Sequence, residues 1–175
     1  MIGGFTNRFL AEVGHEALAP LRYVSQRDRD RPASRRPRYR GALRPWPATD
    51  PETGEKHPFR VLYVWSSEEA DSVAAGRERA LTKAEEELAK VRRGLGGRYY
   101  KTAKQVEAKL ATILTPSVHD ILSVRVADRD GTPPLSWRRN LRAIAQLART
   151  DGIYALATNL PGRLNSSRVL RIYKQ

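Results

Sequence analysis

An amphipathic pattern about seven helical turns long is the feature that most constrains how this chain can fold. Mostly apolar residues recur at intervals of three and four positions between Val73 and Leu95, which places them on one side of a helix. These residues are Val73, Arg77, Ala80, Leu81, Ala84, Leu88, Val91 and Leu95. Ser66 or Ser67, followed by Glu68 and Glu69, predicts the start, because acidic side chains favour the positive end of a helix dipole. The glycines at 94, 96 and 97 predict its end. Glu86 and Lys90 are expected to form an i,i+4 ion pair.

The remaining elements mix strands and helices without a regular alternation. The strongest strand signal is Phe59–Ser66, and a second helix is predicted over Thr102–Leu114, ended by Pro116, so that the two long helices form a hairpin. The other expected elements are a helix at 6–13, strands at 21–25 and 121–127, a strand or helix lead-in at 135–137, a helix at 141–148, a strand following Asp151 and a helix capped by Asn165. This mixture predicts the α+β class.

Net charge indicates the class of partner. The chain carries 32 Lys and Arg against 19 Asp and Glu, with a pI near 10.6, which favours a polyanion and above all nucleic acid. The alternative is an Arg-rich solvated surface without a specific partner. No apolar run approaches the roughly 20 residues that span a bilayer, and there is no cysteine, so we expect a cytoplasmic protein without a membrane partner.

The positive charge is concentrated in residues 26–47, where hydrophobic periodicity disappears and Pro and Arg dominate. Nine Arg, no Lys and two Asp lie between Arg22 and Arg44. We predict an exposed arm or irregular hairpin that contacts DNA, since guanidinium forks suit phosphates and aromatic rings can stack on bases. The candidate DNA-binding residues are Arg35, Arg36, Arg38, Tyr39, Arg40, Arg44 and Trp46. The alternative is a solvated arm with no function.

Motifs of catalytic or metal chemistry are not found. His15, His57 and His119 stand alone, without the spacing of a zinc site. The Asp128-x-Asp130-Gly131 segment lacks the closing Glu of a calcium loop and predicts a hairpin turn. The sequence also contains neither a phosphate-binding Gly-Lys-Ser/Thr loop nor a Gly-x-Ser-x-Gly elbow. We therefore predict no catalytic and no metal-binding residues within this chain.

A collinear series of short motifs resembles one enzyme family. The series comprises Gly3-Gly4-Phe5-Thr6-Asn7, Trp46-x3-Asp50-x2-Thr53-Gly54, Arg77-x-Arg79-x5-Glu85, Trp137, Asp151-Gly152 and the C-terminal segment that ends at Tyr173-Lys174-Gln175. It resembles bacterial insertion-sequence DDE transposases of the group often called family four. Their Tyr-x2-Arg-x3-Glu motif carries the third catalytic carboxylate. Tyr173 matches the Tyr, and the chain stops before the Arg and the Glu.

The resemblance implies a fragment of a ribonuclease H-like enzyme, from just after the second catalytic Asp to just before the catalytic Glu. Residues 1–25 would be part of the core and 26–150 an insertion domain with its Arg-rich arm at 26–47 and helical hairpin at 67–115. Residues 151–175 would be the last strand and the start of the Glu helix. The position expected for the second Asp is Met1 or Ile2. The expected product is a truncated, catalytically inactive transposase piece.

The resemblance also implies the partners. DNA is the expected partner, with Tyr173 and Lys174 near its backbone, and the remainder of a split transposase is a further expected partner. Two divalent metals, Mg or Mn, are implied for the whole enzyme and none for this fragment. DNA-bound protein would be associated with the bacterial nucleoid. The alternative is a free-standing basic module that binds DNA or RNA.

Overall fold

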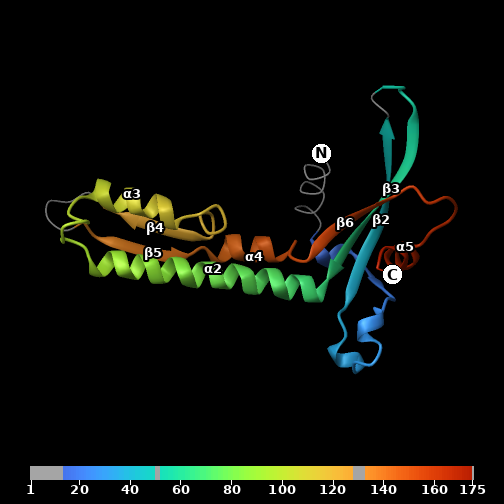
Figure 1. Cartoon of the computed structure of the whole chain (residues 1–175), viewed down its shortest axis with the longest axis horizontal. Coiled ribbons are helices and arrows are strands. Elements are labelled where there is room, and N and C mark those ends of the chain that lie inside the picture. The colour runs from blue at the N-terminus through green and yellow to red at the C-terminus, as the bar shows by residue number, and fades with distance from the viewer. Residues whose placement is uncertain (1–13, 50–51, 128–132, 175) are drawn as a thin grey trace. The chain divides into compact units, whose positions relative to one another are not determined.

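The computed structural model describes residues 14–49, 52–127 and 133–174, which fall into two compact units (Figure 1). The first, here called the sheet unit, comprises Met1–Val73 and Ala148–Gln175, and the second, the helical unit, comprises Ala74–Leu147. Each unit encloses hydrophobic core of its own. Helices and antiparallel sheets are mixed, so the predicted α+β class is confirmed.

The sheet unit is built on four antiparallel strands in the order β1-β2-β3-β6. Their bounds are β1 (Ala19–Leu21), β2 (Tyr39–Thr49), β3 (Lys56–Ser66) and β6 (Ile153–Thr158). The predictions of strands at 59–66 and after Asp151 are confirmed. All residues of β3 from Val61 to Ser66 are buried, as expected of a strand between two neighbours with both faces covered.

Alternate residues of β3 supply two separate core clusters, because successive side chains point to opposite faces of a sheet. On one face, Val61, Tyr63 and Trp65 pack with Leu18, which follows the 3₁₀-helix η1 (His15–Ala17). On the other face, Leu62 and Val64 pack with Val169 and Leu170 of α5 (Ser166–Tyr173). Asn165 caps α5, as predicted, by accepting a hydrogen bond from the Arg168 amide at 2.9 Å.

The expectation of an irregular arm over 26–47 was wrong for its second half, since residues 39–47 belong to the long strand β2. Two prolines, Pro45 and Pro47, obscure this strand in the sequence because proline cannot donate to a ladder. They are tolerated because β1 pairs only with Tyr39–Gly41, so the rest of β2 is a sheet edge on that side. The first half of the arm forms the short 3₁₀-helices η2 (Gln26–Asp28) and η3 (Ala33–Arg35). The strand predicted at 21–25 ends at Leu21.

The helical unit contains most of α2 (Ser67–Arg93) together with α3 (Ala103–Ile113), β4 (Leu122–Val126), β5 (Leu135–Arg139) and α4 (Leu141–Ala148). These elements match the sequence predictions. Thr102 and Gln105 form a reciprocal capping box at the start of α3. The core is formed by apolar side chains of α2, α3, the following turn and the β4–β5 hairpin, namely Leu81, Ala84, Leu88, Val91, Val106, Leu110, Ile113, Val118, Ile121, Leu122 and Leu135.

Two details of the α2 prediction differ from the structure. Val73 is an exposed residue rather than a core residue. Lys90 donates to Glu87 at 2.6 Å, so its hydrogen-bonded partner is the residue at i−3 and not Glu86. Glu86 contributes only a longer-range electrostatic interaction with Lys90.

Several predictions concern residues outside the described ranges. These are the helix at 6–13, the Gly3–Asn7 motif, Asp50 and the turn at Asp128–Gly131. The resemblance also predicted which segments derive from the transposase core (1–25 and 151–175) and which from its insertion domain (26–150). The two compact units do not test this prediction of origin. No helix in the described part of the chain is long and apolar enough to cross a membrane.

Candidate nucleic-acid interface

The segment between β1 and β2 is held in place by a buried carboxylate. Asp28 at the end of η2 is only 1% exposed. The Ser25 hydroxyl donates to Asp28 Oδ2 at 2.5 Å, and Nη1 of Arg31 lies 2.9 Å from Asp28 Oδ1 as an ion pair. A buried charge is stable only when it is paired and hydrogen-bonded, so these contacts fix the path of the segment.

Part of the positive charge of this segment stabilises the fold. Arg36 donates from Nε to the carbonyl of Arg31 at 2.8 Å and from Nη2 to the carbonyl of Arg29 at 2.7 Å. Arg27 pairs with Glu68, and Arg40 donates to the carbonyls of His15 and Glu16 at 3.3 and 3.1 Å. Arg36 and Arg40, both predicted to contact DNA, therefore have structural hydrogen bonds within the sheet unit.

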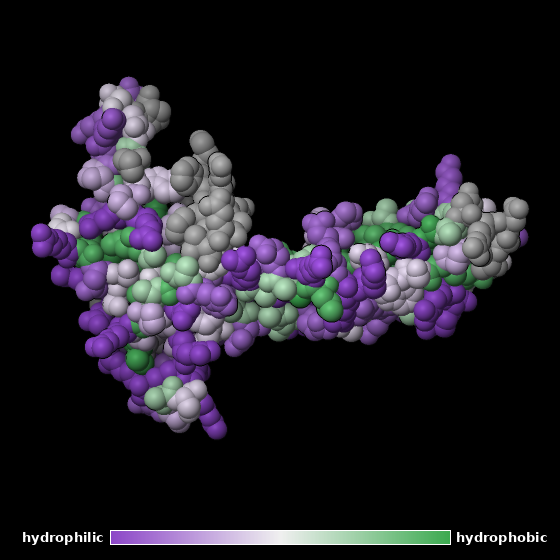
Figure 2. Space-filling model, turned by 180° about the vertical axis from the view of Figure 1, so that it is seen from behind, coloured by the Kyte–Doolittle hydropathy of each residue, from purple (hydrophilic) through white to green (hydrophobic). Residues whose placement is uncertain are grey.

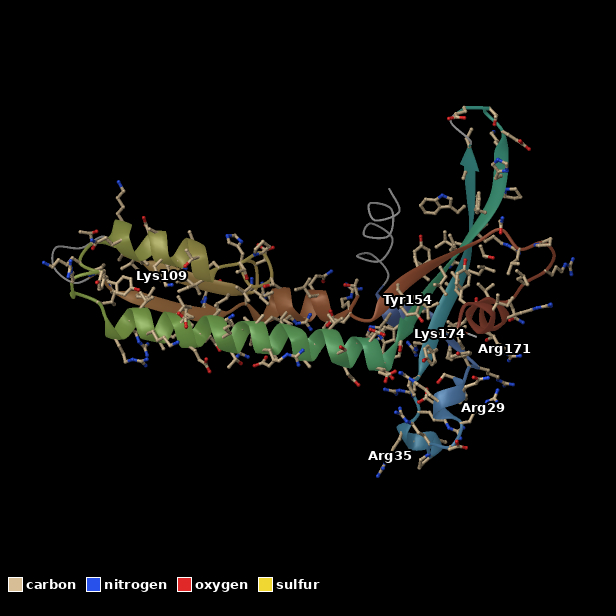
Figure 3. The ribbon with its side chains drawn as sticks, in the orientation of Figure 1. Arg29, Arg35, Lys109, Tyr154, Arg171 and Lys174 are labelled. Atoms are coloured by element: carbon tan, nitrogen blue, oxygen red, sulfur yellow. The ribbon has the colours of Figure 1, made fainter. Side chains whose placement is uncertain are left out.

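A second group of arginines is exposed and, within the described residues, without an ion pair. This group comprises Arg22, Arg29, Arg35, Arg38 and Arg44. Arg29 and Arg35 project from the η2–η3 segment, as Figure 3 shows. Figure 2 shows hydrophilic side chains gathered at the lower end of the sheet unit, where this segment lies. These guanidinium groups are free to bind an anion in solution.

Helix α5 adds further positive charge beside this segment. Arg168 and Arg171 are exposed, three positions apart, on the side of α5 away from the buried Val169 and Leu170. Burial raises the pKa of Tyr23, nearby Asp28 raises it further, and the charges of Arg171 and Arg27 oppose this rise. The joint effect on Tyr23 indicates that Arg171 of α5 and Arg27 of η2 lie in the same neighbourhood.

Tyr39 belongs to the core and not to an exposed stacking surface. It is 5% exposed, and Tyr23 meets its ring edge-on at a centroid distance of 5.1 Å. Burial raises the pKa of Tyr39 and also that of Tyr154 of β6, which packs against the same core cluster. A ring enclosed in this way has no open face on which a DNA base could stack.

Tyr173 and Lys174 attach the last turn of α5 to the sheet. Nζ of Lys174 lies over the rings of Tyr39 and Tyr154, 5.2 and 5.6 Å from their centroids, in cation–π geometry. The Tyr173 hydroxyl donates to the Ala157 carbonyl of β6, and the Tyr23 hydroxyl donates to the Lys174 carbonyl at 3.4 Å. Both predicted DNA-contact residues therefore have structural contacts, although Tyr173 stays half exposed.

Arg44 and Trp46 lie further along β2, away from η2 and η3. Trp46 is half buried, is the cross-strand neighbour of Phe59 and packs against the cluster of Val61, Tyr63 and Trp65. The predicted arginines with free guanidinium groups are therefore Arg35 and Arg38, which are close in the chain, and Arg44, which lies apart from them on β2.

A groove of about 540 Å³ lies beside the 33–38 segment. Its basic lining comes from Arg36, Arg38 and Arg40, and its aromatic lining from His15, Tyr23, Tyr39 and Trp65. The rings of His15 and Trp65 are stacked with their centroids 4.9 Å apart. Because the lining contains three arginines and no carboxylate, the groove has the charge to accept a phosphate group.

A second groove, of about 600 Å³, borders the same segment. It is lined by Arg31, Arg35 and Arg38 but also by Glu68 and Asp71. The two carboxylates partly cancel its positive field, so the groove beside His15 is the better anion site of the two.

The described residues do not fit the two-metal site that the resemblance implies for a whole transposase. Among them, no three His, Asp or Glu side chains come together in a group that could hold a metal ion. Comparisons with profiles of known protein families, with curated proteins and with solved structures find no match to this chain.

The candidate surface includes four arginines that were not among the predicted contact residues, which are Arg22, Arg29, Arg168 and Arg171. For α5 a signal was present in the sequence. Once Asn165 caps a helix and Val169 and Leu170 face the core, helical spacing places residues 168 and 171 together on the exposed side. No sequence signal distinguishes Arg29 from Arg27 or Arg31. Only the folded structure shows that the guanidinium groups of Arg27 and Arg31 form ion pairs within the described residues.

Proposed function

We propose that this chain is a DNA-binding region of a protein of DNA transposition, similar to insertion-sequence DDE transposases. On this proposal the helical unit, β2 and β3 derive from the family's insertion domain. Strand β6 would then be the last strand of the ribonuclease H-like core, and α5 would be the start of the helix that carries the catalytic Glu. The residues that match the family's motifs include no catalytic carboxylate, so we assign DNA binding and no strand cleavage to residues 1–175.

The observation that carries the proposal is the division of the arginines between two roles. Arg27, Arg31, Arg36 and Arg40 hold the 22–40 segment in one conformation. Arg22, Arg29, Arg35 and Arg38 then extend from this segment, with Arg168 and Arg171 on α5. Preorganised guanidinium groups bind phosphates with less loss of conformational entropy than groups on a flexible arm. This arrangement supports a phosphate-binding surface better than it supports a solvated arm without function.

A free-standing module that binds DNA or structured RNA is the second candidate. Two compact units, each enclosing hydrophobic core of its own, support it, because such a chain could fold without the rest of a transposase. On this candidate the same arginines contact the nucleic acid. Competition between matched DNA and RNA duplexes for the purified chain distinguishes the two, since the first candidate predicts preference for DNA.

The test is fluorescence anisotropy of a labelled 20-base-pair DNA duplex titrated with the purified chain over a series of salt concentrations. Each phosphate contact contributes about 0.9 to the slope of log K against log salt. The double substitution Arg29→Gln with Arg35→Gln should therefore lower the slope by about 1.8. A control with the same loss of charge is Arg79→Gln with Arg93→Gln, two exposed arginines on α2. Absence of binding at low salt, or an equal effect of both double substitutions, would contradict the proposal.

A further inference from the structure

The outward face of the β4–β5 hairpin carries two arginines and two serines. In register, Ser123 lies opposite Arg138, and Arg125 lies opposite Ser136. Because side chains alternate along a strand, these four residues share one face and form a diagonal pattern of arginine and serine. A small cavity of about 130 Å³ lies among them, beside Trp137. We call these four residues the Arg–Ser face.

The apolar side chains on the opposite face of the hairpin pack in the hydrophobic core of the helical unit. Leu122, Val124, Val126, Leu135 and Trp137 pack into the cluster formed with α2 and α3. This packing fixes the register, because a slip of one residue would turn every apolar side chain toward solvent. The Arg–Ser face is therefore the face of the hairpin opposite to the one that packs into this core, and its Arg125–Ser136 end borders α3 at Glu107.

The arginines of the helical unit divide into paired and unpaired groups, as they do in the sheet unit. Arg139 binds Glu78 and Glu85, and the guanidinium group of Arg92 lies 4.6 Å from the centre of the Trp137 ring. Arg125 and Arg138 are exposed, and within the described residues neither has a carboxylate partner. The strands β4 and β5 contain no Asp or Glu at all. The Arg–Ser face is thus positively charged. Glu107 of α3 lines a groove together with Arg125 and Ser136 but forms no ion pair with Arg125.

We propose that the Arg–Ser face binds the phosphodiester backbone of duplex DNA as a second contact surface, separate from the arginines of η2, η3 and α5. The inference rests on the proposed function, because DNA is the polyanion it assumes. Diagonal neighbours on an antiparallel pair are about 7–8 Å apart, which lets Arg125 and Arg138 engage separate phosphates. The serine hydroxyl groups between them donate further hydrogen bonds to phosphate oxygens.

The overall charge of the helical unit agrees with this partner. Residues 74–147 contain 15 Lys and Arg against 8 Asp and Glu. On the Arg–Ser face itself the balance is more extreme, since both charged side chains are arginine. A protein partner would need an acidic patch to complement the two arginines, whereas the DNA backbone carries the complementary negative charge whatever its base sequence.

The experiment uses the full chain and the same 20-base-pair duplex in a salt series. Arg125→Gln with Arg138→Gln should lower the slope of log K against log salt by about 1.8, as expected for two lost phosphate contacts. Arg125→Lys with Arg138→Lys should keep the slope, since the charge is retained. Ser123→Ala with Ser136→Ala should weaken binding while the slope stays unchanged, because an uncharged hydroxyl displaces no counterion. The control is again Arg79→Gln with Arg93→Gln.

The outcomes separate this inference from the proposed function. If the unmodified chain does not bind the duplex, both fail. If it binds, and the Arg125/Arg138 and Arg79/Arg93 double substitutions lower the slope equally, diffuse charge explains binding by the helical unit and the Arg–Ser face is not a site. If the Arg125/Arg138 substitution leaves slope and affinity unchanged, the inference fails while DNA binding through η2, η3 and α5 stands. Circular dichroism melting confirms that each variant is folded, which is expected because the substituted side chains are exposed or only partly buried.

Discussion

The guanidinium group of Arg139 donates two parallel hydrogen bonds to the carboxylate of Glu85, joining β5 to α2. Nε lies 3.0 Å from Oε1 and Nη2 lies 2.7 Å from Oε2. Nη1 also donates to Glu78 at 2.8 Å. Because the side chains of Arg139 and Glu85 are 32% and 27% exposed, solvent screens this pair less than it screens a fully exposed ion pair. The pair attaches the hairpin to the longest helix.

Glu85→Gln should lower the free energy of unfolding by about 1–2 kcal/mol, because the substitution removes a charged acceptor from a two-bond contact. Urea denaturation of the variant and the unmodified chain measures the difference. Glu86→Gln is the matched control, since Glu86 is exposed on the same helix and makes no hydrogen bond to Arg139. Equal destabilisation by the two substitutions would show that the Arg139 contact does not stabilise the helical unit.

The same pair predicts a pH dependence. The hydrogen bonds from Arg139 hold the pKa of Glu85 below its ordinary value of 4.5, although burial acts in the opposite direction. A carboxyl group with a lowered folded-state pKa stabilises the fold above its unfolded-state pKa and loses this contribution as the pH falls through the folded-state value. The difference in melting temperature between the unmodified chain and Glu85→Gln should therefore be constant from pH 7 to about 5.5 and shrink below 4.5. A difference that grows on acidification would contradict this account.

Two tyrosines of the sheet unit should respond oppositely to loss of the hydroxyl group. The Tyr154 hydroxyl is buried and has no hydrogen-bond partner among the described residues, whereas hydrogen bonding with the buried Ser66 acts against the rise that burial causes in the pKa of Tyr39. Tyr154→Phe should leave stability unchanged or raise it by up to about 1 kcal/mol, because an unsatisfied buried polar group is removed. Tyr39→Phe should cost about 1–2 kcal/mol, because the Ser66 hydroxyl loses its partner. Chemical denaturation ranks the two variants, and the reverse order would refute the assignment.

Elements with a clear period or cap were predictable from the sequence. The α2 pattern, the Asn165 cap and the β3 apolar run depend on residues close in the chain, and the structure confirms them except for Val73, which is exposed. Strand β2 was missed because it contains two prolines, which have no N–H to donate to a neighbouring strand. Proline is compatible with a strand only where that side of the strand is a sheet edge. Here that edge depends on β1 being only three residues long, a tertiary fact that no local pattern contains.

The candidate surface was predictable in composition but not in the role of each residue. Tyr39 and Arg35 are four positions apart in the same basic segment, yet one is buried and the other projects into solvent. Lys174 follows Tyr173 at the C-terminal end of α5, and only the position of Tyr39 and Tyr154 shows that its charge lies over aromatic rings. The sequence indicates that arginine is abundant here, while packing determines which arginines remain free.

Arg35 and Arg36 are adjacent in sequence and should have opposite phenotypes. Arg36→Gln should lower the free energy of unfolding by about 1–2 kcal/mol, because two backbone carbonyls lose a charged donor. Arg35→Gln should leave stability unchanged and lower the DNA salt slope by about 0.9. Thermal melting and anisotropy on both variants provide the two measurements. Loss of stability in Arg35→Gln, or none in Arg36→Gln, would contradict the separation into structural and free arginines.

Gly152 should be irreplaceable by alanine in the turn before β6. Its φ of +74° is a left-handed conformation that costs an alanine about 1–2 kcal/mol. A Cβ here would also lie 2.5 Å from the Ala70 amide nitrogen and 2.6 Å from the Ser66 carbonyl oxygen. Gly162 is the matched control, since its φ is +81° but nothing lies within 4 Å of a Cβ built there. Gly152→Ala should therefore destabilise the chain well beyond Gly162→Ala in urea denaturation, because only the first substitution forces β6 away from the start of α2. Equal effects of the two substitutions would mean that backbone conformation alone, and not this close approach, requires glycine at position 152.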